Sequence, residues 1–209
     1  MTSATYFVTD IEADGPDPAK NSMLSFATVA CSQEHGVIDC FEAVLHPRAD
    51  RHTHAETMAW WKTQPMAFKA ATADPGAPSA VMNEFANWVE KHSAPRIFAA
   101  SPVLFDGGWI DEYLKTYVTT RIFNGPFKWR KLFDGNGLDI PSYLGGLFGW
   151  PAERFDEMVH QAPDSWRGKI KHTHRAIDDA TGYANILLHA LRMNSARPID
   201  SNDFARNRK

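Results

Sequence analysis

The chain has 209 residues, of which 44% are hydrophobic and 22% charged, and its formal net charge is −3. This length and composition predict a single globular domain with a hydrophobic core. The negative net charge argues against a protein that binds long nucleic-acid duplexes through a basic surface. No apolar run approaches the roughly 18 residues of a membrane span, and the first residues lack the basic and apolar regions of a signal peptide. We therefore expect a cytoplasmic protein with no membrane partner.

β-Strand patterns fill the first 45 residues. Residues 6–11 are apolar or β-prone on both faces, which is typical of a central strand. Residues 23–30 and 37–45 predict two further strands, and the turn signal at residues 34–36 between them predicts a hairpin. The segment DGPDPAKN between the first two strands is typical of a loop.

Two cysteines, Cys31 and Cys40, fall near this hairpin. Two cysteines in a chain of this size do not form a disulfide framework, so we expect reduced thiols in a reducing compartment. A pairing between them is the less favoured alternative.

Helical patterns dominate from residue 53 onward. Residues 53–64 predict a helix that Pro65 stops, and Ser79 is a plausible N-cap of a second helix. Strands followed by alternating helices and strands predict an α/β sheet with helices packed on it. The further expected elements are a strand at 96–100, a helix at 106–117, a turn at 124–126, a strand at 137–140, a short helix near 143–147 and a long helix at about 175–193.

Asp10 and Glu12 lie two residues apart at the end of the first predicted strand, so both side chains leave the same face of the sheet. Adjacent carboxylates repel each other and are costly to bury unless a cation binds them. For the pair alone, a solvated strand end is the simpler interpretation. The apolar strand before the pair and the Gly/Pro loop after it favour a ligand crevice at the strand end.

Asp106 follows an apolar run and begins a predicted helix. An acid is favoured there as a cap or as a partner of the helix dipole, so this position alone indicates only a helix start. We expect Phe105 beside it to pack as a core anchor.

His174 and Asp179 are five residues apart, which is about 500° on a helix, so they cannot share one helix face. If both serve one site, His174 lies in the loop before the last helix and Asp179 about one turn inside it. Asp179 adjoins an apolar stripe, where an acid is expensive unless it is paired or metal-bound. We interpret Asp178 as a solvated or secondary partner and His172 as a surface histidine. The stripe consists of Ala176, Ala180, Ala184, Leu187 and Leu191.

The order of these motifs resembles the DEDDh exonucleases of the DnaQ-like superfamily, which include RNase T, oligoribonuclease and the epsilon proofreading subunit of bacterial DNA polymerase III. The string HRAIDDA is similar to the family's H-x-A-x-x-D-A, and MLSFATVA is similar to its second strand. The segment TMAWWKTQP resembles the smaller RNase AS-like exoribonuclease branch, and Asp139 lies where the family often has an Asp. The resemblance implies a ribonuclease H-like mixed sheet flanked by helices, as a single domain over residues 1–194 with a polar tail at 195–209.

The resemblance also implies a site. Asp10, Glu12, Asp106 and Asp179 would bind two Mg²⁺ or Mn²⁺ ions, and His174 would be the general base. Hard oxygen ligands suit these cations, and histidine suits proton transfer near neutral pH. The implied reaction removes nucleoside monophosphates from single-stranded 3′ ends, with RNA favoured, and the implied assembly is a homodimer. The loop after Glu12 lacks the Thr-Thr-Gly of many relatives, which leaves the contacts to the terminal nucleotide open.

The residues proposed to contact substrate flank the loop after Glu12 or lie beside the site. Aromatic side chains can stack on a terminal base, although core packing explains the tryptophans equally well. Short basic runs at residues 128–131 and 169–172 are either phosphate contacts or ordinary solvated surface. The predicted substrate-binding residues are Ile11, Ala13, Met23, Leu24, Trp60, Trp61 and Phe105.

Two alternatives remain at the level of sequence. One is a DNA exonuclease of the proofreading type. The other is a catalytically silent nucleic-acid-binding module on the same fold, and the presence of all five site residues argues against it.

Overall fold

The computed structural model describes residues 4–123, 125 and 130–196. Within these residues a five-stranded mixed sheet has the strand order β3-β2-β1-β4-β7. The first three strands along the chain pair antiparallel, whereas β4 and β7 add in parallel on the other side of β1. The predicted mixed sheet and hairpin are therefore confirmed. The strands are β1 (Thr5–Ala13), β2 (Met23–Ser32), β3 (Gly36–Val44), β4 (Arg96–Ala100) and β7 (Leu138–Asp139).

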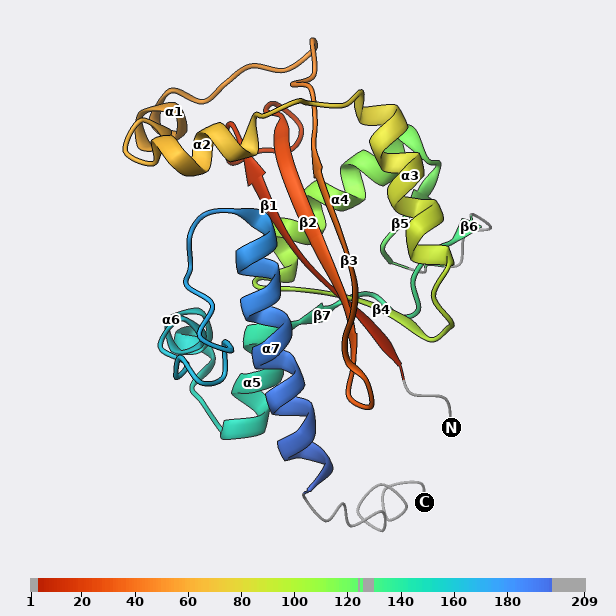
Figure 1. Ribbon diagram of the computed structural model, residues 1–209, viewed down its shortest axis with the longest axis vertical. Helices are drawn as coiled ribbons and strands as arrows, with labels where there is room; N and C mark the ends of the chain where they lie inside the picture. Colours follow the sequence, from red (N-terminus) through yellow and green to blue (C-terminus); the bar gives the residue numbers. More distant parts are fainter. Residues whose placement is uncertain (1–3, 124, 126–129, 197–209) are drawn as a thin grey trace.

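Helices cover both faces of this sheet (Figure 1). Because side chains alternate along a strand, Phe7 and Ile11 of β1 pack on one face with α3 (Pro78–Glu90) and α4 (Val103–Tyr117). Val8 packs on the opposite face with α5 (Ile140–Phe148) and α7 (Ala176–Ser195). The strand β2, between β3 and β1, is buried along its whole length. The chain thus forms three layers, and the fold class predicted from sequence is confirmed as a single domain.

The carboxyl end of β4 is where the chain turns into α4. β1 and β4 run parallel up to the pair Thr9↔Ala100, so Asp10, the next residue of β1, lies beside the carboxyl end of β4. Asp139 at the end of β7 accepts hydrogen bonds from the N–H groups of Val103, at 2.8 Å, and Ser142, at 2.9 Å. This carboxylate therefore links the first residues of α4 and α5 and helps to hold the beginning of α4 at the carboxyl end of β4.

Several helix boundaries differ from the predicted ones, and at two of them a proline begins a helix. The helix expected at 53–64 is α1 (Ala55–Trp61), and Pro65, predicted to stop it, instead begins a second helix that was not predicted, α2 (Pro65–Ala71). The helix expected after Ser79 begins at Pro78 with Ala77 as its N-cap. Proline fits the first helical turn because its missing N–H is not needed there. α4 begins three residues before Asp106, at Val103.

Besides α2, four short elements were not predicted, because each has too few residues to show a period. They are β5 (Thr120–Arg121), β6 (Arg130–Lys131), the 3₁₀ helix η1 (Ala152–Arg154) and α6 (Phe155–His160). β5 and β6 pair in parallel as a separate small sheet. The turn predicted at 124–126, part of the basic run at 128–131 and most of the predicted tail lie outside the described residues.

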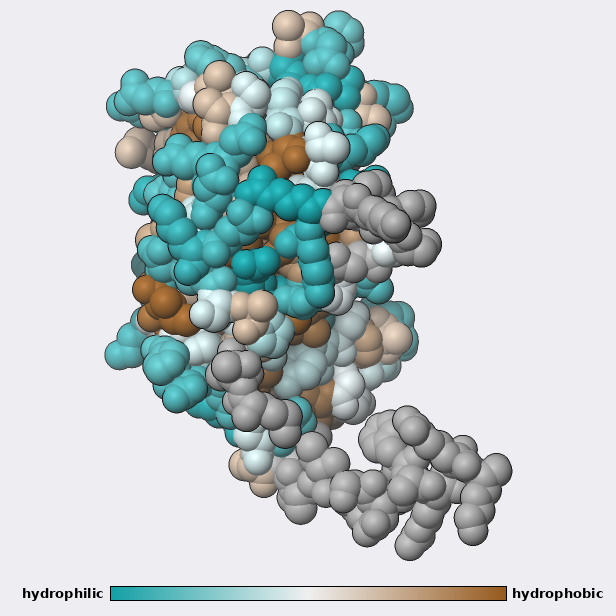
Figure 2. Space-filling model, turned by 90° about the vertical axis from the view of Figure 1, so that its right-hand side faces the viewer, coloured by the Kyte–Doolittle hydropathy of each residue, from teal (hydrophilic) through white to brown (hydrophobic). Residues whose placement is uncertain are grey.

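The apolar side chains are gathered inside the three layers. On the face that carries α3, β5 and β6, Figure 2 shows hydrophobic residues only as small separate areas among hydrophilic ones. Cys31 is buried and Cys40 exposed, and both are free, as predicted. No helix in the described part of the chain is long and apolar enough to span a membrane.

Candidate active site

Three of the predicted metal ligands meet where β1 passes the beginning of α7. Asp10 and Glu12 leave the face of β1 that α7 covers, and Asp179 lies in the first turn of α7. One carboxylate oxygen from each of the three can be chosen so that all lie within 4.8 Å of one another. Asp179 is only 1% exposed and Glu12 is buried as well. The structure therefore brings together residues that are almost 170 positions apart.

Asp106 reaches the same group from the opposite layer. It lies in the first turn of α4, next to the carboxyl ends of β1 and β4, and is buried. Backbone hydrogen bonds at Ile11 and Ser101 favour its ionised form. Its charge acts on both Asp10 and Glu12, so the four acids form one electrostatic unit.

The carboxylates of this unit are difficult to ionise together. Burial, followed by the charges of Asp179 and Asp106, raises the pKa of Glu12 to about 9. Burial also raises the pKa of Asp106 to about 8, against its backbone hydrogen bonds. The pKa of Asp10 is raised well above its usual value, first by burial and then by the charges of Asp106, Glu12 and Asp179. A bound divalent cation would supply the missing positive charge, so oxygen ligands and charge both fit such an ion.

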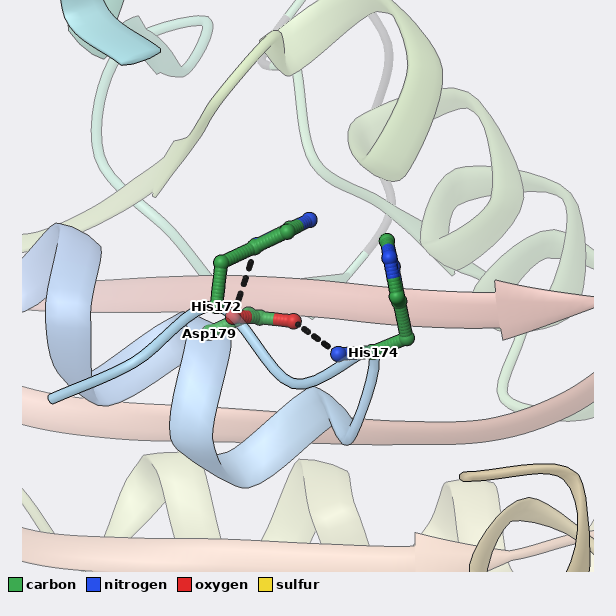
Figure 3. A group of neighbouring side chains, drawn as sticks. All are labelled: His172, His174 and Asp179. Atoms are coloured by element: carbon green, nitrogen blue, oxygen red, sulfur yellow. Dashed lines mark hydrogen bonds and ion pairs between the residues drawn. The ribbon is translucent and has the colours of Figure 1, made fainter. Parts of the chain in front are cut away.

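Asp179 also holds the segment that carries His174. Its carboxylate accepts a hydrogen bond from the backbone N–H of His174 at 3.0 Å (Figure 3) and another from that of Thr173 at 3.3 Å. Asp178 accepts from the hydroxyl of Thr173 at 2.7 Å, which makes it a secondary partner. His174 precedes α7 with a φ of 56°, a left-handed conformation that is uncommon outside glycine. The five-residue spacing therefore places His174 off the helix, as expected.

The His174 ring lies between Trp60 and His172. Its centroid is 4.9 Å from that of Trp60, with the two ring planes perpendicular, and 4.4 Å from that of His172. Burial and then the neighbouring His172 lower the pKa of His174, while Asp179 opposes this shift. A neutral imidazole with a lowered pKa is able to accept a proton near neutral pH.

Two residues at the site were missed in the sequence. His172 is partly exposed, but its Nδ1 lies 2.8 Å from Asp179 Oδ1, so the interpretation of it as a surface histidine was incomplete. Arg167 is 7% exposed, and its Nη2 lies 3.6 Å from the same oxygen. Its guanidinium also lies over the ring of Tyr183, 5.0 Å from the centroid. Neither residue belongs to a periodic pattern, and only the Gly168 turn next to Arg167 indicates an unusual backbone.

The predicted substrate-binding residues separate into buried and exposed groups. Trp61 belongs to the core and donates from Nε1 to the carbonyl of Ala13 at 2.9 Å. Trp60 is 38% exposed and faces His174. Phe105 is 42% exposed, so its prediction as a core anchor was wrong: α4 turns Asp106 inward and the residue before it outward. The remaining buried members are Ile11, Ala13, Met23 and Leu24.

A mixed sheet with four acids and a histidine at one end is the arrangement of a ribonuclease H-like exonuclease domain. The nuclease domain of 3′hExo, a DEDDh family member bound to rAMP, superposes with a TM-score of 0.62 at 10% identity, covering 95% of this chain and 96% of that one. E. coli exonuclease I in complex with a dT13 oligonucleotide gives 0.62 at 18% identity, covering 91% of this chain and 41% of that one. A 3′-exonuclease that recognises the histone mRNA stem-loop gives 0.62 at 11% identity, with 91% and 82% covered. Comparison with curated proteins finds no match.

The family model of the 3′–5′ exoribonuclease Rv2179c-like domain matches residues 5–191. The chain belongs to this family. The predicted enzyme class, a 3′–5′ exonuclease, is thereby confirmed.

Proposed function

We propose that this exonuclease is metal-dependent and removes nucleoside monophosphates from the 3′ end of single-stranded RNA. The observation that supports this most strongly is the meeting of Asp10, Glu12 and Asp179 within 4.8 Å in a buried site beside His174. Buried carboxylates repel one another, so their clustering is unfavourable without a cation, whereas a metal-dependent phosphodiester hydrolase needs such a cluster.

Asp10, Glu12, Asp106 and Asp179 would hold two ions of Mg²⁺ or Mn²⁺. These hard cations prefer carboxylate oxygens over the nitrogen and sulfur ligands of softer metals. Bound at these carboxylates, they would lower the pKa of a water molecule and stabilise charge on the oxygens of the phosphate.

His174 would accept the proton of the attacking water. Its lowered pKa keeps the imidazole neutral, and the backbone bonds to Asp179 hold the residue at the edge of the acid group. The imidazole ring also makes a perpendicular contact with Trp60. The general base is therefore tied to a metal ligand through its own backbone.

Trp60 and Phe105 are the exposed aromatic residues among those predicted to contact substrate. Stacking on such rings is sequence-tolerant and suits an unpaired end, since every base has a π-face. The net charge of −3 also favours a short single-stranded end over a duplex. The exoribonuclease description of the matched family supports RNA as the substrate.

A cleavage assay with 5′-labelled oligonucleotides tests this function. We expect an RNA ladder that shortens from the 3′ end with Mg²⁺, stops with EDTA and forms more slowly from DNA of the same sequence. Faster cleavage of DNA than of RNA would contradict the proposed RNA preference and indicate DNA as the preferred substrate. Binding of both oligonucleotides without any turnover in Mg²⁺ or Mn²⁺ would contradict the proposed catalytic activity.

We infer from the resemblance to RNase T that the chain forms a homodimer, and from its composition that it acts in the cytoplasm. Sedimentation at micromolar concentration tests the first inference, because a monomer would contradict it. A tagged protein found outside the cytoplasmic fraction would contradict the second.

A further inference from the structure

A cavity of about 770 Å³ lies along the segment between α6 and α7. This is the size of a typical ligand site. Its lining contains the side chains of Arg167, Lys169, Lys171, His160 and His172, with Asp164 as its acidic member. A net positive cavity is unexpected in a chain with a net charge of −3.

The cavity adjoins the acid group directly. His172 lines the cavity and also lies 2.8 Å from Asp179, and Figure 3 shows its ring and that of His174 next to each other on one side of this carboxylate. Trp60 contacts His174, which places the aromatic side of the site with α1 and the basic side with the α6–α7 segment. Figure 1 shows the beginning of α7 between these two parts.

The turn at residues 164–169 builds this basic wall. Lys169 N–H bonds to the carbonyl of Asp164 at 2.9 Å, and both Gly168 and Lys169 have left-handed backbones, with φ of 68° and 65°. A β-carbon on Gly168 would lie 2.7 Å from the amide nitrogen of Asn185, which itself donates to the Arg167 carbonyl at 3.1 Å. The close approach of Gly168 to Asn185 and the left-handed backbone of Lys169 shape a tight turn. In this turn the Arg167 side chain is buried and the Lys169 side chain is exposed.

Arg167 lines the cavity, and its Nη2 lies 3.6 Å from Asp179 Oδ1 as an ion pair without a hydrogen bond. Its Nε donates to the carbonyl of Ile170 at 3.3 Å, whereas its buried Nη2 has no hydrogen bond. A guanidinium donor without a hydrogen bond is able to take a further acceptor, and the guanidinium fork matches phosphate oxygens. Lys169 and Lys171 are exposed at the rim, and no ion pair joins either of them to another described residue. Gly182 permits the guanidinium position, since a β-carbon there would lie 2.6 Å from Nη2.

We propose that this cavity is a subsite for backbone phosphates of the substrate strand on the 5′ side of the scissile bond. The inference rests on the proposed function, because it assumes a strand whose 3′ end lies at the acid group. The terminal base would lie on the Trp60 side, and the rest of the strand would leave across the basic wall. Arg167 would bind a phosphate at the floor, and Lys169 and Lys171 would bind the next ones at the rim.

The test compares RNA substrates of two and eight nucleotides, each labelled at its 5′ end, in wild type and in the double variant Lys169→Gln/Lys171→Gln. The ratio of the dinucleotide KM to the octanucleotide KM should fall about tenfold in the double variant, because only the longer strand reaches the rim. The slope of log binding constant against log salt concentration for the octanucleotide should become less steep by about 1.4, because the variant loses two phosphate contacts on a single strand. Lys91→Gln, an exposed lysine at the end of α3, is the matched control and should change neither quantity.

An unchanged KM ratio, or the same change in the Lys91 variant, would overturn the subsite. Inhibition by free AMP separates the source of the phosphate. If the double variant relieved AMP inhibition with no effect of strand length, the cavity would bind free nucleotide and the proposal would be wrong. If wild type cleaved neither RNA, the proposed function would fail, and octanucleotide affinity by fluorescence anisotropy would still decide whether the lysines bind the strand.

Discussion

The acid group and the α6–α7 segment lie against each other but are built differently. Asp10 and Glu12 belong to a strand that is hydrogen-bonded to β2 along its length, and Asp106 and Asp179 lie in the first turns of long helices. His174 and Lys169 belong to irregular backbone, and both have left-handed φ values. Regular elements fix side chains that must repel one another, whereas the irregular segment supplies groups that meet water and substrate. We expect substitutions to divide in the same way.

Asp10→Asn should have the largest effect. The acid group would lose the carboxylate on which the charges of the other three acids act, and turnover should fall to below about one thousandth of wild type, since a bound metal contributes several kcal/mol of charge stabilisation. Initial rates on 5′-labelled RNA measure this. Glu84→Gln, on the exposed surface of α3, should retain the wild-type rate. More than a tenth of wild-type turnover in the Asp10 variant would show that this acid is dispensable.

His174→Ala should have the next largest effect. It removes the predicted base from the irregular segment and should slow turnover about 10²-fold, the usual range for loss of a general base. Far-UV circular dichroism should be unchanged, because the ring packs only at the edge of the core. His35→Ala in the exposed β2–β3 turn serves as the control. Near wild-type turnover in the His174 variant would refute the assigned base.

Trp60→Ala should weaken substrate capture rather than folding. The ring is exposed and contacts His174, so its loss should lower kcat/KM about tenfold, the scale of one base stacked on an aromatic ring. Trp60→Phe should recover most of that loss because it keeps a π-face. Equal losses in both variants would mean that the residue acts by shape and not by stacking.

The metal-free protein should lose stability as pH rises. The folded-state pKa values of Glu12 and Asp106, about 9 and about 8, exceed the ordinary carboxyl values of the unfolded chain. The folded state therefore holds extra protons, and its stability should fall by about 1.4 kcal/mol per pH unit for each one, between about pH 5 and 8. Melting temperatures in EDTA measure this trend, and saturating Mg²⁺ should flatten it. Constant or rising stability over that range would contradict the coupling of these acids.

The sequence predicts the acid group on β1, α4 and α7 more completely than it predicts the α6–α7 segment. The apolar alternation of residues 6–11 and the stripe beside Asp179 are periodic, and the structure confirms β1 and α7 with the stripe buried. The spacing of His174 and Asp179 also predicted that the histidine precedes the helix. Each of these inferences rests on a repeat that local geometry imposes.

The irregular region contains no such repeat. Arg167 and His172 reach Asp179 only because a tight turn brings their segment back onto α7. Phe105 shows the opposite error, since the apolar run before Asp106 indicated a core residue and the helix phase turns it outward. Which face of a helix is buried depends on where the helix begins, and α4 begins three residues earlier than its sequence indicated.

Calorimetric titration of Mn²⁺ into three metal-free proteins tests most directly whether the two regions have separate roles. Wild type and His174→Ala should bind the ion alike, whereas Asp10→Asn should show at least a tenfold weaker affinity, because Asp10 is one of the proposed metal ligands. Equal binding by all three proteins, or loss of binding in the His174 variant alone, would contradict the assignment of the acids as metal ligands and of the histidine as a separate base.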